Sequence, residues 1–422
     1  MSDAKATRAA IGSALKAHVE VSKGEPLRLA ISRELDASPK LGGNERRFVA
    51  FTVRELSRHL RRLDTAAKAA GHSTAKLQLP EDRAVLRYAL WRRHFAKVPV
   101  EKVLKEVGLP GPIRPRSIPD AVIAKALEAD EPPPFGTTPV ELAASKHSFP
   151  MWLAEAIAAA APPDRIDAVL EGLNREPVLT LRARPPGKRD ALLAEVNASG
   201  FAVEACSELP DALRVTDGKR AIFDSRFMKN GQLQVMDLGS QLLAAYCQVS
   251  PGQVVVDYCA GAGGKTLVLA DAVGDRGRVY AWDAKPKRLA EAKQRTSALR
   301  MNHVSFPTLP RIDLADVVLV DAPCSGTGTL AREPDHKWTL TADEVAKFAK
   351  TQSEILDAVA AQLRSGAVIV YGTCSLLRAE DEAVVDAFLS RHGDFTADGP
   401  ALRVWPDEIS GGGFFGARLK KR

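Results

Sequence analysis

A run of four β-preferring apolar residues, ended by an acid, a proline and a cysteine, constrains this chain more than any other stretch. Val317–Gly328 reads Val-Val-Leu-Val-Asp-Ala-Pro-Cys-Ser-Gly-Thr-Gly. The short apolar run predicts a parallel strand buried on both faces. Pro323 predicts the end of that strand, because proline lacks the amide hydrogen that a ladder needs. We therefore expect Asp321 and Cys324 at the carboxyl end of the strand, where open α/β sheets bind ligands.

A second cysteine follows a second apolar run. Gly366–Val370 predicts another buried strand, and it leads into Tyr371-Gly-Thr-Cys-Ser375. From Asp237 onward, predicted strands alternate with predicted helices, which indicates a doubly wound, mainly parallel sheet of Rossmann-like α/β class. Cys324 and Cys374 are then expected at the ends of adjacent strands. Two cysteines at such positions, one of them beside Asp321, favour a reactive site over core packing.

A turn of small residues lies between the predicted strand Val254–Tyr258 and the helix after it. The turn consists of Cys259, Ala260, Gly261, Ala262, Gly263, Gly264 and Lys265. A phosphate-binding Walker loop requires glycine where Cys259 stands, and the dinucleotide pattern GxGxxG requires glycine where Thr266 stands, so both patterns fail. Asp283 ends the second predicted strand, 20 residues after Gly263, and an acid there suits two ribose hydroxyls. A methyl-donor site, another nucleotide site and a purely structural turn all remain open from these residues.

The net charge of +7 is uneven along the 422 residues. Residues 1–128 contain 25 Lys and Arg against 14 Asp and Glu, a balance of +11, whereas the remainder contains 34 basic and 38 acidic residues. Periodic apolar residues predict helices in this basic third, with Val49, Val53, Leu56, Leu60 and Leu63 forming one buried stripe. The asymmetry favours an RNA-binding helical domain, with an ordinary helical scaffold as the alternative.

A proline-rich segment, Glu131–Pro139, predicts a stiff, non-helical linker that few contacts cross. We expect three domains: a helical domain at 1–130, a small α/β subdomain at 140–236 and a catalytic α/β domain at 237–422. The small subdomain has a basic group around Pro185, which is either a phosphate grip or a solvated loop. It consists of Arg182, Arg184, Lys188 and Arg189.

Several classes of protein are disfavoured by what the sequence lacks. The first ten residues have no apolar core of signal-peptide type, and no run reaches the roughly 18 apolar residues of a membrane span. The five cysteines show no CxxC pair, so we expect free thiols and no metal site. The expectation is a cytoplasmic monomer without metal or membrane partners.

The motifs together resemble those of the RsmB/Sun family of RNA cytosine-5 methyltransferases. The resemblance rests on Asp257–Lys265, Asp321–Gly328 and Tyr371–Ser375, with support from Arg332–Trp338 and the acidic Glu380–Glu382. The helical N-terminus resembles the NusB-like domain of the bacterial rRNA enzymes. The turn departs from the family pattern, because Gly261 and Ala262 replace alanine and proline, and Asn302–Ile312 lacks the acid expected near the adenine.

This resemblance implies S-adenosyl-L-methionine-dependent methylation of cytosine carbon 5 in RNA, most of all small-subunit rRNA, with tRNA as the alternative. It implies that Cys374 attacks carbon 6, that Cys324 assists elimination, and that Asp321 contacts the N3 and amino edge of the base. The cofactor is expected along Cys259–Lys265 and Asp321, with Asp283 on its ribose. A DNA cytosine-5 methyltransferase, an oxidoreductase and a non-catalytic RNA-binding assembly factor are the rival interpretations.

Overall fold

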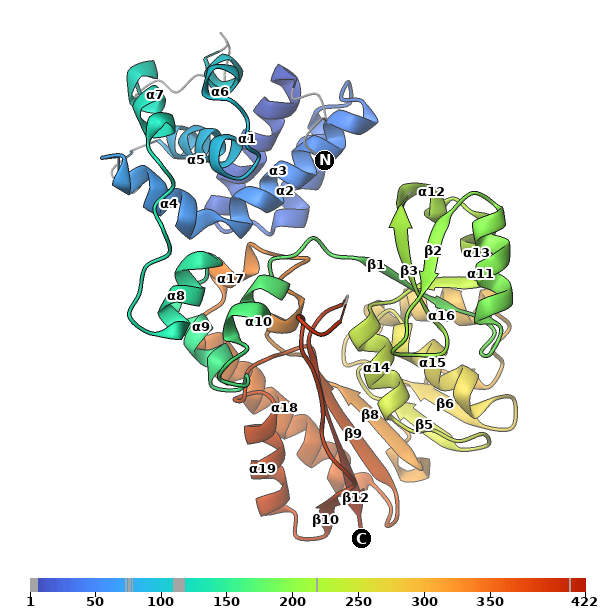
Figure 1. Ribbon diagram of the computed structural model, residues 1–422. Coiled ribbons are helices and arrows are strands. Elements are labelled where there is room, and N and C mark those ends of the chain that lie inside the picture. The colour runs from blue at the N-terminus through green and yellow to red at the C-terminus, as the bar shows by residue number, and fades with distance from the viewer. Residues whose placement is uncertain are drawn as a thin grey trace. The chain divides into compact units, whose positions relative to one another are not determined.

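The computed structural model describes residues 7–72, 74, 77, 79–108, 118–217, 219–409 and 411–422. The chain forms two compact units (Figure 1). The first contains the chain up to Asn174 together with Arg332–Thr339, and the second contains Arg175–Ala331 and Leu340–Arg422. The domain boundaries expected near residues 130, 140 and 236 stay predictions.

The first unit is helical over its described residues. Its helices before the proline segment are α1 (Arg8–Ser22), α2 (Leu27–Ala37), α3 (Gly43–Arg58), α4 (Leu60–Ala69), α5 (Pro80–His94), α6 (Val100–Val107) and α7 (Asp120–Glu128). After it come α8 (Pro139–Lys146), α9 (Met151–Ala158) and α10 (Ile166–Gly172), and the inserted segment contributes α17 (His336–Thr339). The predicted apolar stripe is continuous in the core except at Leu60, which is half-buried beside a turn at His59 that separates α3 from α4.

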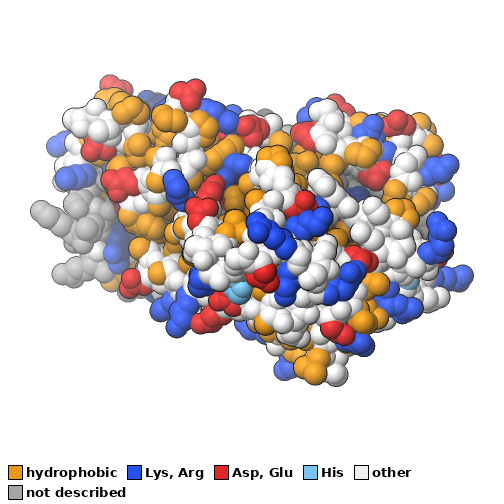
Figure 2. Space-filling view, turned by 90° about the horizontal axis from the view of Figure 1, so that it is seen from below, with side chains coloured by type: hydrophobic (Ala, Val, Ile, Leu, Met, Phe, Trp, Pro, Cys, Tyr) orange, Lys and Arg blue, Asp and Glu red, His pale blue; other side chains and the backbone are white. Residues whose placement is uncertain are grey.

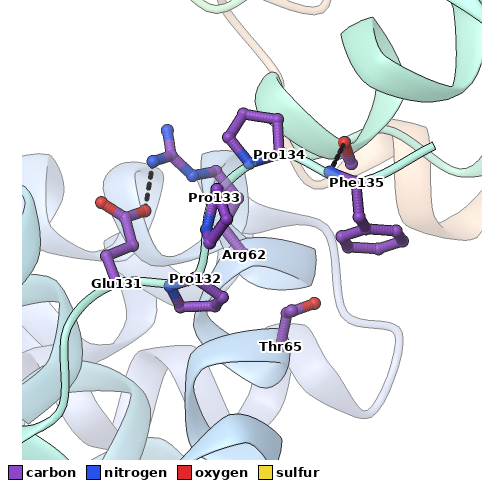
Figure 3. Close-up of a pocket in the computed structure, with 8 residues that line it drawn as sticks. Arg62, Thr65, Glu131, Pro132, Pro133, Pro134 and Phe135 are labelled. Carbon is purple, nitrogen blue, oxygen red and sulfur yellow. Dashed lines mark hydrogen bonds and ion pairs between the residues drawn. The ribbon is translucent and has the colours of Figure 1, made fainter.

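The proline segment is extended, as predicted, and lies against α4 (Figure 3). The Glu131 carboxylate pairs with the Arg62 guanidinium. Phe135 donates its backbone N–H to Ser145 Oγ at 2.9 Å, and the Arg61 guanidinium lies 5.3 Å from the centre of the Phe135 ring. Both ends of the segment are therefore fixed by side chains of the same unit.

Hydrogen bonds also join the helices before the proline segment to residues after it. Arg61 donates its backbone N–H to Ser148 Oγ at 2.8 Å and its guanidinium to Phe149 O at 2.7 Å. The buried Lys337 donates to Arg58 O at 2.8 Å. The expectation that few contacts cross the segment is therefore wrong. Prolines predict that the segment is stiff, but they do not predict which side chains on either side of it form contacts with each other.

The second unit begins with a small sheet of antiparallel pairs in the order β2-β3-β1-β4. Its elements are β1 (Leu179–Ala183), α11 (Arg189–Ala198), β2 (Ala202–Ala205), β3 (Ala212–Asp217), α12 (Lys219–Phe223), α13 (Arg226–Lys229) and β4 (Leu233–Val235). Two of the four basic residues around Pro185 are not available to a phosphate. Arg182 and Arg184 are largely buried and both bind the Asp271 carboxylate at 2.6–2.7 Å, because a buried charge requires a partner.

The large sheet has the strand order β10-β12-β9-β8-β5-β6-β7. Its strands are β5 (Val254–Asp257), β6 (Arg278–Ala281), β7 (Val304–Ser305), β8 (Val317–Asp321), β9 (Val368–Thr373), β10 (Phe395–Ala397) and β12 (Phe414–Lys421), and β11 (Leu402–Val404) pairs with β12. Strands β7-β6-β5-β8-β9 pair in parallel, and β12 runs antiparallel between β9 and β10. The predicted doubly wound, mainly parallel sheet is confirmed.

Helices cover both faces of this sheet because its strands present apolar residues on both sides. On one face Val256, Val318 and Ile369 pack among residues of α18 (Ala342–Gln362) and α19 (Glu382–Arg391). On the other face Val255, Val317 and Val370 pack among residues of α15 (Gly264–Val273). The remaining helices of the unit are α14 (Leu238–Tyr246) and α16 (Leu289–Ala298). Burial on both faces leaves the carboxyl ends of the strands as the place for a site.

Basic side chains are spread over the face of the molecule that Figure 2 shows. Lys and Arg lie there as separate groups, with Asp and Glu side chains between them. In the part of the chain that the structure describes, no helix combines the length and the apolar character that a membrane crossing needs.

Candidate active site

The two predicted cysteines lie together at the carboxyl edge of the large sheet. Strands β8 and β9 are parallel neighbours in which Asp321 is paired with Gly372, so the loops after the two strands begin side by side. The sulfur atoms of Cys324 and Cys374 are 3.3 Å apart, within hydrogen-bonding range for thiols, and both residues are partly accessible. The adjacency predicted from the sequence is confirmed.

The Cys324 thiol is a weak acid in this setting. The pKa of Cys324 is raised well above its ordinary value, first because its thiol hydrogen-bonds to Cys374 and next because it is buried. Either sulfur can be the donor of the hydrogen bond that joins the two thiols. A thiolate, and not a thiol, is the nucleophilic form of cysteine. Which of the two sulfur atoms attacks stays a prediction, with Cys374 expected in that role.

The loop that contains Cys324 packs backbone against backbone on the loop that contains Cys374. Gly328 donates its N–H to Cys374 O at 2.9 Å, and Gly413 donates to Gly328 O at 2.8 Å. A Cβ atom at Gly328 would lie 2.1 Å from Gly413 O and 3.0 Å from Cys374 O. Only glycine permits this approach, so Gly328 helps to fix the position of the Cys374 backbone.

Asp321 and Lys265 form an ion pair at the point where the strand order reverses. Lys265 follows β5, Asp321 ends β8, and Lys265 Nζ donates to Asp321 Oδ2 at 2.7 Å. Burial alone would lower the pKa of Lys265, but the charge and the hydrogen bond of Asp321 outweigh burial and raise that pKa. The Asp321 side chain is 28% exposed. A carboxylate that is still accessible to a ligand therefore lies at the topological switch point, where such sheets bind ligands.

The glycine turn between β5 and α15 has the tight backbone that its composition predicts. Gly261 has φ +51° and Gly263 has φ +83°, a region that side chains with a Cβ rarely adopt. A Cβ at Gly263 would also lie 2.6 Å from the Ala292 Cβ of α16. Gly264 has no neighbour that would meet an added Cβ within 4 Å. The turn therefore leaves open space beside the N-terminal end of α15.

Asp283 follows β6 and lies against this turn. Its carboxylate accepts hydrogen bonds from Gly261 N at 3.1 Å and Lys285 N at 2.8 Å. It also pairs with the Arg288 guanidinium at 3.2 Å, and the Asp283 side chain is only 4% exposed while that of Arg288 is 59% exposed.

Asp257 is an acid of the site whose role the sequence did not reveal. It ends β5, is 1% exposed, and accepts from Thr266 Oγ1 at 2.6 Å. Its other oxygen, Oδ1, is buried without a hydrogen-bond donor among the described residues. Burial raises the pKa of Asp257 to about 7. The position of Asp257, after an apolar run and directly before the glycine turn, was the sequence signal that could have identified this residue.

The residues at this edge fit an adenosine-type methyl donor. The tight turn allows close approach of a ligand to the backbone, and the Asp283 carboxylate lies against that turn. Within the described ranges, the buried Asp257 Oδ1 lacks a donor, which is an acceptor left over next to the turn. Over those same ranges, no group of three His, Cys, Asp or Glu side chains could hold a metal ion, and the five cysteines are free thiols, as expected.

Solved structures share this fold. PH0851 superposes with a TM-score of 0.75 at 22% identity over 98% of this chain and 99% of its own. NSun6 from Pyrococcus horikoshii, solved with the S-adenosylmethionine analogue SFG, gives a TM-score of 0.57 at 18% identity over 65% of this chain and 98% of its own. These likenesses show the fold, which is the Rossmann-like sheet of class I methyltransferases.

Sequence comparison gives the family. The family model described as 16S rRNA methyltransferase RsmB/F matches residues 244–420, and the ferredoxin-like domain of RsmF/B-like methyltransferases matches residues 149–221. Ribosomal RNA small subunit methyltransferase B of Serratia proteamaculans is 32% identical over 66% of this chain and 67% of its own length. The probable enzyme of the same name from Synechocystis is 28% identical over 93% of this chain and 95% of its own. The chain belongs to the RsmB/F family of small-subunit rRNA methyltransferases.

Proposed function

We propose that this rRNA methyltransferase modifies carbon 5 of a cytosine through a covalent bond between Cys374 and carbon 6 of the base. The observation that carries the proposal is the 3.3 Å separation of the Cys324 and Cys374 sulfur atoms at the ends of β8 and β9. Carbon 5 of cytosine is a poor nucleophile, and addition of a thiolate to carbon 6 makes it enamine-like. Covalent catalysis of this kind divides one difficult step into two easier ones.

The two cysteines have different tasks in this reaction. The Cys374 thiolate forms a bond to carbon 6, and the electron pair of the 5,6 double bond becomes available at carbon 5. S-adenosyl-L-methionine supplies an electrophilic methyl group on sulfur. Cys324 first loses its thiol proton to solvent, and its thiolate, a strong base because the pKa of Cys324 is raised, then accepts the carbon 5 proton. The electrons of that C–H bond restore the double bond, the bond from carbon 6 to sulfur breaks, and Cys374 leaves as a thiolate.

Asp321 and Lys265 provide the polar contact for the pyrimidine edge. The Asp321 side chain, which Lys265 Nζ contacts at 2.7 Å, accepts a hydrogen bond from the exocyclic amino group of cytosine. Negative charge develops at N3 and O2 as Cys374 adds, and the buried ammonium of Lys265 offsets that charge from behind the carboxylate.

The cofactor-binding residues are proposed as the turn Cys259–Lys265, Asp283 and Asp321. The target base has to be unpaired or rotated out of its stack to reach two sulfur atoms at the edge of a sheet. The helices before the proline segment are proposed to contact the RNA backbone, because residues 1–128 carry an excess of basic side chains.

Product analysis tests this proposal. Small-subunit rRNA from cells that lack the protein is incubated with the purified enzyme and S-adenosylmethionine carrying a labelled methyl group. The rRNA is then digested to nucleosides and separated by mass spectrometry. We expect the label in 5-methylcytidine. Label at a ribose, at another base or at an exocyclic nitrogen would contradict cytosine-5 chemistry.

A further inference from the structure

A buried carboxylate, Glu380, binds both the loop that contains Cys324 and the loop that contains Cys374. It lies between β9 and α19 and is 0% exposed. Its Oε1 accepts from Ser325 N at 2.8 Å and from Gln352 Nε2 at 3.1 Å. Its Oε2 accepts from Ser375 Oγ at 2.7 Å and from Ser325 Oγ. Four donors converge on one side chain, which matches the acceptor capacity of an ionised carboxylate.

The donors are the immediate neighbours of the two thiols. Ser325 follows Cys324 in the loop after β8, and Ser375 follows Cys374 in the loop after β9. Glu380 therefore ties the two loops to a single anchor, one residue away from each sulfur. Gln352 of α18 extends the tie, because its Nε2 also donates to Pro323 O at 2.9 Å, on the other side of Cys324.

The neighbouring acid holds Cys374 from its other side. Asp381 is 0% exposed and accepts from Thr373 Oγ1 at 2.5 Å, and Arg403 donates to Asp381 at 2.7 Å. Thr373 precedes Cys374 in the chain. The residues on both sides of Cys374 are thus bound to consecutive buried acids, which leaves its loop little freedom to shift.

A role in helix capping does not account for Glu380. The N-cap residue of α19 is Asp381, and no side chain makes a capping hydrogen bond there. Burying a carboxylate costs several kcal/mol unless it is fully hydrogen-bonded, and an apolar residue would fill a purely structural position without that cost. The carboxylate is instead placed where both thiol-bearing loops can donate to it.

We propose that Glu380 is a positioning residue that sets the spacing of the Cys324 and Cys374 sulfur atoms through Ser325 and Ser375. The proposal rests on the two-thiol chemistry proposed above, because only that chemistry requires the spacing. Glu380 itself touches no reacting atom. Displacement of catalytic groups by about 1 Å costs roughly 100-fold in rate, so loss of the anchor is expected to lower kcat.

The test compares Glu380→Ala with the isosteric Glu380→Gln and with Ser325→Ala/Ser375→Ala. In Glu380→Gln the amide oxygen still accepts from Ser325 N, and the amide nitrogen faces hydroxyls that can turn to accept. Glu354→Gln is the matched control, since that side chain is 64% exposed on α18 of the same unit. For each variant we measure the melting temperature, the Kd for S-adenosylmethionine, and kcat and KM for methyl transfer to small-subunit rRNA.

A second readout reports the thiol spacing without RNA chemistry. Diamide oxidises two nearby thiols to a disulfide: they lose two electrons and two protons, and diamide gains both as its hydrazine. Disulfides form only within a narrow range of Cβ separations. The rate of the Cys324–Cys374 crosslink, followed by peptide mass spectrometry, therefore reports whether the loops stay in place.

We expect Glu380→Ala and the double serine variant to lower kcat roughly 100-fold, to slow the crosslink several-fold, and to leave the cofactor Kd unchanged. Glu380→Gln should have a higher kcat and a faster crosslink than Glu380→Ala. Wild-type crosslinking and kcat in folded Glu380→Ala would overturn the proposal, as would a lower melting temperature with an unchanged crosslink rate. If Cys374→Ala still methylates rRNA, the two-thiol chemistry is wrong. The crosslink rate of the Glu380 variants then still tests whether Glu380 sets the spacing of the two thiols.

Discussion

Replacement of Asp283 by alanine tests whether this acid binds the cofactor. The variant removes an acceptor that holds Gly261 N at 3.1 Å and Lys285 N at 2.8 Å, and it frees Arg288. A hydrogen bond to a charged group contributes about 1.5–3 kcal/mol, which corresponds to a rise in Kd of roughly 10- to 150-fold. The weaker binding has two sources: the ribose hydroxyls lose their acceptor, and the turn at Gly261 loses its anchor.

Isothermal titration calorimetry with S-adenosylmethionine measures this Kd. Asp283→Asn retains one acceptor oxygen, so its Kd should lie between those of the wild type and Asp283→Ala. Asp275→Ala is the control, because the Asp275 side chain is fully exposed in the loop that precedes β6. A Kd for folded Asp283→Ala within twofold of the wild-type value would refute the assignment of Asp283 to the cofactor site.

Three further predictions concern packing, protonation and RNA binding. Gly328→Ala should lower the free energy of unfolding in urea by about 1–3 kcal/mol and reduce kcat, because the added Cβ would meet backbone atoms. Gly393→Ala is the control: a Cβ there meets nothing within 4 Å, so the free energy of unfolding and kcat should both stay unchanged. The pKa of Asp257 is raised in the folded state to about 7, so the folded state binds the extra proton and stability falls as pH rises from about 4 to 7. Asp257→Asn should flatten that fall in urea titrations at several pH values, and an unchanged slope would contradict it. Lys40 and Arg47 are exposed in the basic helical region. The double variant Lys40→Gln/Arg47→Gln should make the slope of log K for RNA association against log salt concentration shallower by about 0.7 for each phosphate that is no longer neutralised. An identical slope would assign those charges to solubility alone.

The sequence predicted the parts of the site that depend on local pattern. The apolar run at Val317–Val320 and its stop at Pro323 require only strand periodicity and the chemistry of proline. The adjacency of Cys324 and Cys374 followed, because parallel strands end at the same edge of a sheet. Gly261 and Gly263 were recognisable as a tight turn, since their positive φ values need glycine.

The interactions that tune the site could not be predicted, because they join residues far apart in the chain. Lys265 was expected at the cofactor, yet its Nζ binds Asp321, 56 residues later. Glu380 was recognised only as part of an acidic motif, but it precedes α19 and its carboxylate binds Ser325, 55 residues earlier. Periodicity determines which residues are buried, but it does not determine which loop a buried polar side chain will meet.

The central claim is that Cys374 attacks the base and Cys324 acts after methyl transfer, and one gel tests it directly. Cys374→Ala and Cys324→Ala are each incubated with S-adenosylmethionine and undermethylated small-subunit rRNA, then separated under denaturing conditions. We predict that Cys374→Ala forms no covalent adduct and transfers no methyl group. Cys324→Ala should accumulate an RNA-linked protein that carries the methylated cytosine. An adduct with Cys374→Ala and none with Cys324→Ala would exchange the two roles, and full methylation by both variants would contradict the covalent mechanism.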